Sequence, residues 1–286
     1  MPRILILYFS LSGSTARVAE AMAFGLRAKA CRVDLCNLKD ERPPRLDGYD
    51  LLGIGSPAYY FRPPFNVMDY LNNLPDFEGL PSFVFTLHGT YPGDAGNAIR
   101  KALEKKGSNV LGYFPCHGAD LFVGYLKAGI LFSPDHPNRE ELLQAEEFGR
   151  KIATIMAGEG YTKPQNDPPP SLIYMVERFV TNRFLARTIF TRLFRVNKKK
   201  CSSCGLCSQE CPAQNIAMHQ KGYPVWNNHC LLCFHCQMQC PEESISSPMS
   251  WLIFQPVIHY NISQATQDAA IEHARVEHNN GETTRL

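Results

Sequence analysis

Eight cysteines in two matching frames dominate the second half of the sequence. Both frames read Cys-x-x-Cys-x-x-Cys-x-x-x-Cys-Pro, and they begin 29 positions apart, at Cys201 and at Cys230. The first three thiols of a frame can hold three corners of one iron–sulfur cube, whereas the fourth, fixed by proline, points away and completes the cube of the other frame. The spacing therefore predicts two crossed 4Fe-4S clusters. The first is held by Cys201, Cys204, Cys207 and Cys240, and the second by Cys211, Cys230, Cys233 and Cys236.

Two other uses of these thiols are weaker. Structural zinc also favours Cys-x-x-Cys pairs, but it needs only four ligands and no triplet of this spacing. A disulfide framework is typical of secreted chains. The apolar run within Met1 to Ser10 is too short for the hydrophobic region of a secretory signal, which argues against such a framework. The region from about 197 to 248 resembles the bacterial-type two-cluster ferredoxins, with no ligand missing. That resemblance implies a small α+β domain that transfers single electrons.

The composition allows a second, larger domain before the cysteines. The chain has 286 residues, 44% of them apolar, and a net charge of +2, so it can supply a real core but shows no overall bias toward polyanions. Residues 161–200 are different, because they carry 9 basic and 2 acidic side chains. Free thiols and the lack of an 18-residue apolar run indicate a chain of the reducing cytoplasm without a membrane span.

The N-terminal part predicts alternating strands and helices. Apolar runs and helical spacing assign five strand–helix units. The predicted strands are 4–8, 32–36, 50–55, 82–87 and 109–115, and the best-marked helices begin at about Ser14, Asp94 and Arg139.

Small hydroxyl residues fill the turn between the first strand and the first helix. Their side chains and the backbone N–H groups at the helix start can seat a phosphate, because the helix dipole is positive there. The turn lacks the glycine and lysine patterns of ATP- and NAD-binding loops, and it can also be read as an ordinary helix cap. The candidate phosphate ligands are Ser10, Ser12, Gly13, Ser14 and Thr15.

Two later loops, which follow the third and fourth predicted strands, carry aromatic residues suited to stacking on a planar ring. In a doubly wound sheet these loops share the carboxyl edge where ligands bind. The first loop contains Pro57, Ala58, Tyr59, Tyr60 and Phe61, and the second contains His88, Gly89, Thr90, Tyr91 and Gly93.

With these three loops, residues 2–160 resemble the flavodoxins. The resemblance implies a flavodoxin-like α/β fold, a doubly wound parallel sheet with strand order 2-1-3-4-5, and FMN bound by its phosphate and ring loops. One departure concerns charge, since flavodoxins usually surround the flavin with acidic residues, whereas Arg62 follows the first aromatic loop here. If Arg62 or His88 approaches the ring, the reduced flavin should form more easily. Cys31, Cys36 and Cys116 lack ligand spacing and are predicted to be core residues.

The expected domain bounds are 1–160 for the flavin domain, 161–196 for a proline-rich linker and basic helix, 197–248 for the cluster domain and 249–286 for a tail. The basic helix is interpreted as a bridge between the domains. The alternative is a surface that contacts an anionic bilayer or an acidic redox partner. Nothing indicates nucleic-acid binding. The tail is expected to fold back onto the body, then to be helical and finally disordered.

The whole arrangement resembles the flavodoxin–ferredoxin fusion proteins found mainly in anaerobic prokaryotes. That resemblance implies an electron-transfer protein with FMN and two 4Fe-4S clusters that links one- and two-electron partners. Two alternatives remain open. One is a flavin-dependent reductase of a quinone or another small molecule, with His88 or Tyr59 as proton donor. The other is a redox-sensing interaction protein. Donor and acceptor are expected to be other proteins.

Overall fold

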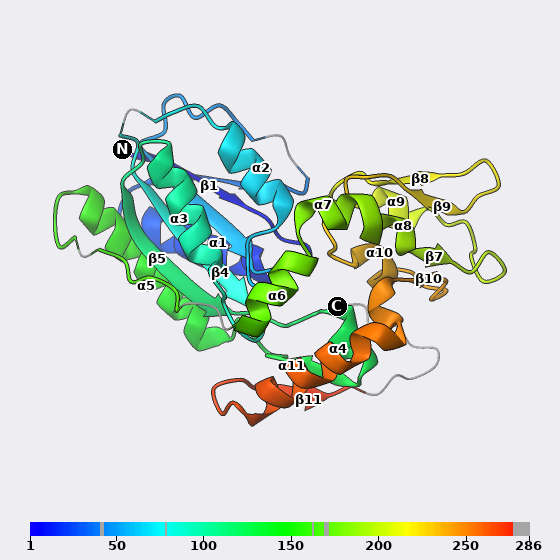
Figure 1. Cartoon of the computed structure of the whole chain (residues 1–286). Helices are drawn as coiled ribbons and strands as arrows, with labels where there is room; N and C mark the ends of the chain where they lie inside the picture. The colour runs from blue at the N-terminus through cyan, green and yellow to red at the C-terminus, as the bar shows by residue number, and fades with distance from the viewer. Residues whose placement is uncertain (41–42, 78, 162, 169–171, 277–286) are drawn as a thin grey trace. The chain divides into compact units, whose positions relative to one another are not determined.

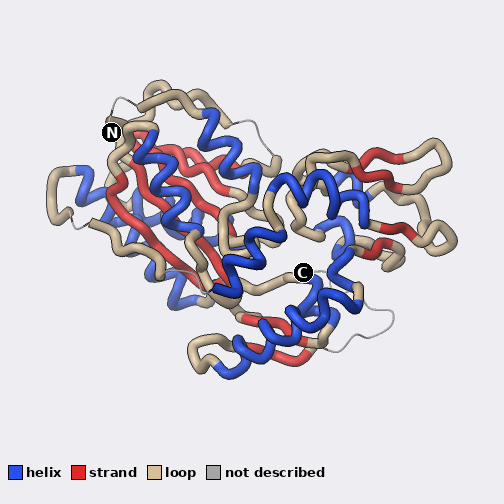
Figure 2. The backbone as a smooth tube through the Cα atoms, viewed as in Figure 1, coloured by secondary structure: helices blue, strands red, loops and turns tan. Residues whose placement is uncertain are grey.

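The chain forms two compact units in the computed structural model, which describes residues 1–276 apart from 41–42, 78, 162 and 169–171 (Figures 1 and 2). Unit 1 consists of Met1–Ala119 and Asp135–Arg178, and unit 2 consists of Asp120–Pro134 and Phe179–Leu286. The chain therefore leaves unit 1 after the fifth strand and makes a short excursion into unit 2. It returns to unit 1 before helix α5 (Arg139–Met156).

Unit 1 is built on a five-stranded parallel sheet of order β2-β1-β3-β4-β5. The central strands are buried on both faces, which explains why their sequences are almost continuously apolar. This strand order confirms the flavodoxin-like fold. The strands are β1 (Arg3–Tyr8), β2 (Arg32–Asn37), β3 (Leu51–Pro57), β4 (Ser82–His88) and β5 (Val110–His117).

Helices cover the sheet and bury its apolar side chains. Helices α1 and α5 lie together and enclose a core that includes Ile4, Met22 and Phe85. Gly149 lets the two helices approach closely, because a Cβ atom there would overlap the carbonyl oxygen of Met22. The thiols of Cys31, Cys36 and Cys116 are buried as expected. The helices of unit 1 are α1 (Ser14–Arg27), α2 (Phe65–Asn73), α3 (Ala95–Lys105) and α5 (Arg139–Met156), with α6 (Leu172–Val180) running to the boundary between the units.

Unit 2 contains the cysteine frames and is made of short elements. Two small antiparallel ladders, β7–β10 and β8–β9, frame the cysteine loops. The elements around the frames are α7 (Arg183–Leu185), the π-helix η1 (Ala186–Phe190), α8 (Thr191–Leu193), β7 (Arg195–Val196), α9 (Leu206–Gln209), β8 (Ile216–Met218), β9 (Pro224–Trp226), α10 (His235–Met238) and β10 (Ile245–Ser246).

The tail belongs to the same unit and is tied to the excursion after β5. Strand β11 (His273–Arg275) pairs antiparallel with β6 (Ile130–Phe132), and α11 (Gln255–Gln267) contacts α4 (Val123–Lys127) (Figure 1). Two 3-10 turns, η2 (Pro248–Ser250) and η3 (Leu252–Phe254), lead into α11. The expected return of the tail is therefore observed as a strand pairing with the excursion. The tail was expected to end in disorder, and its last residues, 277–286, lie outside the described residues.

The division into units differs from the domain bounds expected from the sequence. The expected bridging helix is interrupted, since α6 ends at Val180 and Asn182 begins a new helix by accepting a hydrogen bond from the N–H of Leu185. Polar capping by asparagine competes with helix continuation, which explains the break. The proline-rich stretch before α6 includes residues 169–171, which lie outside the described residues. Among those described, no helix has the length and apolar character needed to cross a bilayer.

Candidate redox centres

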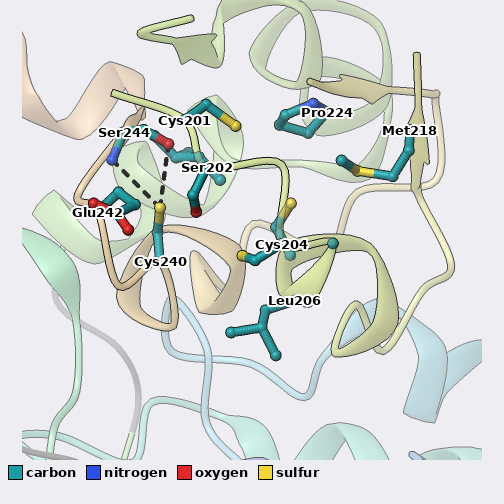
Figure 3. A pocket seen from close by; sticks show the side chains of 12 residues that line it. Cys201, Ser202, Cys204, Leu206, Met218, Pro224, Cys240, Glu242 and Ser244 are labelled. Atoms are coloured by element: carbon teal, nitrogen blue, oxygen red, sulfur yellow. Dashed lines mark hydrogen bonds between the residues drawn. The ribbon is translucent and has the colours of Figure 1, made fainter. Parts of the chain in front are cut away.

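The first set of four cysteines lines one cavity, here called site I. Its lining includes Cys201, Cys204, Cys207 and Cys240, which come from both frames. Figure 3 shows the sulfurs of Cys201, Cys204 and Cys240 turned toward the same space. Cys240 Sγ accepts a hydrogen bond from the backbone N–H of Ser244 at 3.3 Å and lies 3.2 Å from its hydroxyl oxygen. Polar side chains of Ser202 and Glu242 also line this cavity.

The second set lines a separate cavity, here called site II. Its cysteines are Cys211, Cys230, Cys233 and Cys236. Three aromatic rings complete the lining, and Phe194 is stacked between two of them, with ring centroids 5.4 Å from Trp226 and 5.9 Å from Phe234. The structure therefore brings the eight cysteines together in the two crossed groups that the spacing predicts.

The two frames share an unusual backbone. Left-handed φ angles occur at Ser203, Gly205 and Gln214, and each recurs 29 residues later, at Leu232, Phe234 and Glu243. A non-glycine residue in this conformation costs roughly 1–2 kcal/mol, so the repeated angles indicate that both loops are held in a specific shape. That shape aims backbone N–H groups at sulfur, since Asn215 N–H donates to Cys211 Sγ at 3.3 Å just as Ser244 N–H does to Cys240.

The chemistry of both sites fits an iron–sulfur cube better than a single ion. A tetrahedral zinc site would bring its sulfurs to about 3.8 Å from one another. Among the described residues no three His, Cys, Asp or Glu side chains converge to hold one ion. Burial raises the pKa of Cys207 and of Cys230 to about 11, so a bound metal centre is needed to hold these thiols as thiolates at neutral pH.

The turn before α1 leaves backbone donors available. Gly13 precedes the helix with φ 90° and, as a glycine, has no side chain with which to cap the helix start. Among the described residues the N–H groups of Ser14 and Thr15 have no acceptor, whereas Ala16 N–H donates to the Ser10 hydroxyl at 3.3 Å. Asn37 holds the turn from the neighbouring strand through two 3.2 Å hydrogen bonds to the Ser10 backbone. Two unpaired donors at a positive helix end suit an anionic phosphate, so the site fits FMN.

The first aromatic loop is a tight reverse turn. Tyr59 and Arg62 pair across it through two backbone hydrogen bonds, and the central residues Tyr60 and Phe61 both have left-handed φ angles, 51° and 61°. This is the backbone of a type I′ turn, which normally selects Asn or Gly. Two aromatic residues in such positions store strain of roughly 1–3 kcal/mol each, a feature typical of ligand-binding loops.

Phe61 packs on an aromatic residue that the sequence reasoning missed. Its ring stacks on Tyr174 of α6, with centroids 3.9 Å apart and an interplanar angle of 21°, and only 8% of Phe61 is exposed. Tyr91 of the second loop also lies beside Tyr174, at 5.6 Å. Nothing local could identify Tyr174, because it lies more than eighty residues from both partners in the chain.

The two aromatic loops are joined to each other and to α6. Asp94 N–H donates to the Phe61 carbonyl, and a Cβ atom at Gly93 would overlap that carbonyl, so glycine is required there. Arg62 donates to the Arg178 carbonyl of α6 at 3.1 Å, and Arg178 pairs with Asp94 at 2.7 Å. Burial, followed by the positive charge of Arg178, lowers the pKa of Arg62 to about 10, so Arg62 stays charged at neutral pH. Its guanidinium therefore serves as a bridge to α6.

Histidines gather at the carboxyl ends of β4 and β5. The ring of His88 lies 4.5 Å from that of His117, which lies 5.5 Å from that of His136. His136 Nδ1 is 2.7 Å from Glu141 Oε2, a carboxylate that also caps α5. His88 Nδ1 is shielded from solvent and has no hydrogen-bond partner among the described residues. Burial, and then the neighbouring His117, lowers the pKa of His88 to about 3, which keeps it neutral at pH 7.

Comparison with known proteins covers both parts of the chain. Residues 5–122 match the flavodoxin domain family, and residues 193–241 match the 4Fe-4S dicluster domain family. An uncharacterized protein of Methanocaldococcus jannaschii is 28% identical over 154 residues, which cover 52% of this chain and 97% of that protein.

Among solved structures, a flavodoxin from the domain Archaea is 18% identical with a TM-score of 0.44, covering 54% of this chain and 99% of its own. Rubredoxin oxygen:oxidoreductase from Desulfovibrio gigas is 16% identical with a TM-score of 0.43, covering 55% and 36%.

Proposed function

Because this chain joins an N-terminal flavodoxin domain to a C-terminal 4Fe-4S dicluster domain, and is therefore an electron-transfer protein, we propose that it holds one FMN and two 4Fe-4S clusters and passes electrons between them. Other redox proteins serve as its donor and acceptor. The observation that carries the proposal is the crossed grouping of eight cysteines into two separate cavities.

Each group of residues has a defined task in this proposal. Site I and site II supply four thiolates each, and the backbone N–H groups of Asn215 and Ser244 stabilise the charge on sulfur. The free N–H groups of Ser14 and Thr15 receive the FMN phosphate, and the loops 57–61 and 88–93 enclose its ring. FMN, when bound, exchanges one or two electrons, whereas each cluster exchanges one.

The direct test is the composition of the protein after anaerobic purification. We expect about eight irons, about eight sulfides and one FMN per chain. Flash photoreduction of this material should then be followed by redistribution of electrons between flavin and cluster absorbance bands. A colourless, zinc-loaded protein would contradict the proposal, and so would a fully loaded protein whose centres do not exchange electrons.

A second activity, reduction of a quinone or another small molecule at the flavin, is favoured by the histidine row. The neutral His88 offers one ring N–H and one ring nitrogen acceptor beside His117, at the sheet edge where the flavin loops meet. Steady-state reduction of a soluble quinone, with a reduced ferredoxin as electron supply, tests this activity. A rate no higher than that of free FMN excludes it, and replacing His88 with Gln should lower the rate per bound flavin.

A further inference from the structure

The helix formed by α7, η1 and α8 has an inner face and an outer face with opposite character. Ala186, Phe190 and, just beyond the helix, Phe194 are buried, and Phe194 lines site II. On the outside, 71% of Phe184 and 48% of Ile189 are exposed. The outer face is therefore separated from the site II cysteines by about one helix diameter, roughly 10 Å.

The π-helical segment decides which residues share the outer face. On an ideal α-helix Phe184 and Ile189, five positions apart, lie on different sides, but the wider turn of η1 brings residues at this spacing closer to one side. Arg192 follows Ile189 by three positions and is exposed on the same side. Arg195 donates to the carbonyl of Arg192 at 2.7 Å, which holds its guanidinium at the helix end. We call Phe184, Ile189, Arg192 and Arg195 the docking face.

Positive charge predominates in the sequence around this apolar centre. Residues 178–209 contain eight Arg and Lys side chains and no Asp or Glu. Lys199 and Lys200, which follow the docking face, are exposed like Arg192 and Arg195, and none of the four makes an ion pair with a described residue. An aromatic centre with a charged rim is the usual anatomy of a protein–protein interface.

We propose that the docking face receives a small acidic electron-carrier protein, which exchanges one electron with the protein at site II. This inference rests on the proposed function and names the partner class for it. In the forward direction the reduced carrier loses one electron and the protein gains one, with no bond or proton transferred. A carrier with acidic side chains around its own centre complements the basic rim, and such encounters need only a small contact area.

An anionic bilayer is the weaker occupant of the same face. Membrane-surface binding grows with the apolar area that enters the headgroup region. Phe184 and Ile189 project from this helix, and Phe179 and Val180 at the end of α6 are exposed as well, whereas Ala186 and Phe190 are committed to the interior. This apolar area is small beside the eight basic side chains of residues 178–209, a charge pattern that suits an acidic protein partner.

The test follows the rate of reduction by an acidic plant-type 2Fe-2S ferredoxin, mixed with the loaded protein in an anaerobic stopped-flow instrument. For the parent protein the second-order rate constant should fall steeply with salt. The double variant Arg192→Glu/Arg195→Glu should be slower by about tenfold or more at low salt and should approach the parent at high salt. Phe184→Ser should remain slower at every salt concentration, because it removes contact area and not charge.

Matched controls keep the test specific. Lys101→Glu/Lys105→Glu makes the same change in net charge on exposed positions of α3, and Phe24→Ser removes a similarly exposed aromatic from α1. Both should leave the rate constant within about twofold of the parent. Iron and flavin contents should match the parent in every variant, which shows that folding is intact.

Three results would overturn the docking proposal. The first is an equal rate constant for the parent and Arg192→Glu/Arg195→Glu. The second is an equal loss in the α3 control. The third is binding to phosphatidylglycerol vesicles at physiological salt that disappears in Phe184→Ser while the ferredoxin rate is unchanged. If photoreduction of the parent protein is followed by no internal electron transfer, the proposed function is contradicted. The docking proposal is then decided separately, by the rate constants for reduction by ferredoxin.

Discussion

Cys204 of site I is exposed, whereas Cys233, its counterpart 29 residues later, is only partly accessible. The difference begins in the residues between the ligands. Where the first frame has Ser202, Ser203 and Gly205, the second has Leu231, Leu232 and Phe234, all three buried. The backbone angles repeat but the surroundings do not. A duplicated motif can therefore keep its ligand geometry while its two halves diverge in solvent access and polarity.

The electrostatic surroundings diverge as well. The carboxylate of Glu242 lines site I. In site II burial raises the pKa of Cys230, and the positive charge of Arg187 partly opposes that rise. Burial disfavours the extra negative charge of a reduced cluster, and a nearby cation favours it. The two sites are thus expected to differ in potential and in stability toward reagents.

Removing single ligands gives the largest expected effect and tests whether the sites are crossed. Cys204→Ser and Cys240→Ser should abolish the same cluster signal in electron paramagnetic resonance, with a loss of about four irons. Cys211→Ser and Cys233→Ser should abolish the other signal. If Cys240→Ser instead resembles Cys233→Ser, each frame holds its own cube and the comparison between crossed sites fails.

Solvent access should separate the sites next. Iron chelation after mild oxidation is expected to bleach the site I cluster several times faster than the site II cluster, because Cys204 is open to reagents. Following the two signals over time measures both rates. Leu231→Ser/Phe234→Gly should bring the rates together, while Ser202→Leu should protect site I. Equal bleaching in the parent protein would mean that exposure of the ligands does not govern lability.

Trp226 offers a smaller and more specific effect. Its indole N–H lines site II, where burial raises the pKa of the Cys236 thiol and a hydrogen bond from Trp226 opposes that rise, so this N–H is placed to donate to a cluster sulfur. Such a bond stabilises the more negative reduced state. Trp226→Phe should lower the equilibrium constant for one-electron reduction of the site II cluster by about fivefold. A potentiometric titration would record this as a fall of roughly 40 mV in the site II potential, equivalent to about 1 kcal/mol. The site I potential should not move, and a shift in both sites would indicate a general structural effect.

The smallest effect is expected at Ser244. Its hydroxyl oxygen lies 3.2 Å from Cys240 Sγ, but its backbone N–H also reaches that sulfur and is kept in Ser244→Ala. The site I potential should therefore fall by roughly half of the Trp226→Phe shift. Ser202→Ala is the control, since Ser202 lines the same cavity. An unchanged potential in Ser244→Ala would show that the backbone donor alone sets the charge on Cys240.

Much of the molecule was predictable because its signals are local. Cysteine spacing groups the ligands through a short loop whose conformation is set by its own residues. Continuous apolar runs identify buried parallel strands, and small hydroxyl residues before a helix identify the turn from Ser10 to Thr15. The aromatic loops were found in the same way, since each directly follows a strand whose carboxyl end must lie at the ligand edge.

Long-range packing supplied what local patterns do not encode. Tyr174 contacts Phe61, and β11 pairs with β6, only because the folded backbone brings distant segments together, and neither residue type nor spacing marks such partners. The outer face at Phe184 depends on one wider helical turn, a deviation from the period on which sequence patterns rely. Spacing specifies what a residue can bind, whereas burial and neighbours, which set the strength of that chemistry, exist only after the chain has folded.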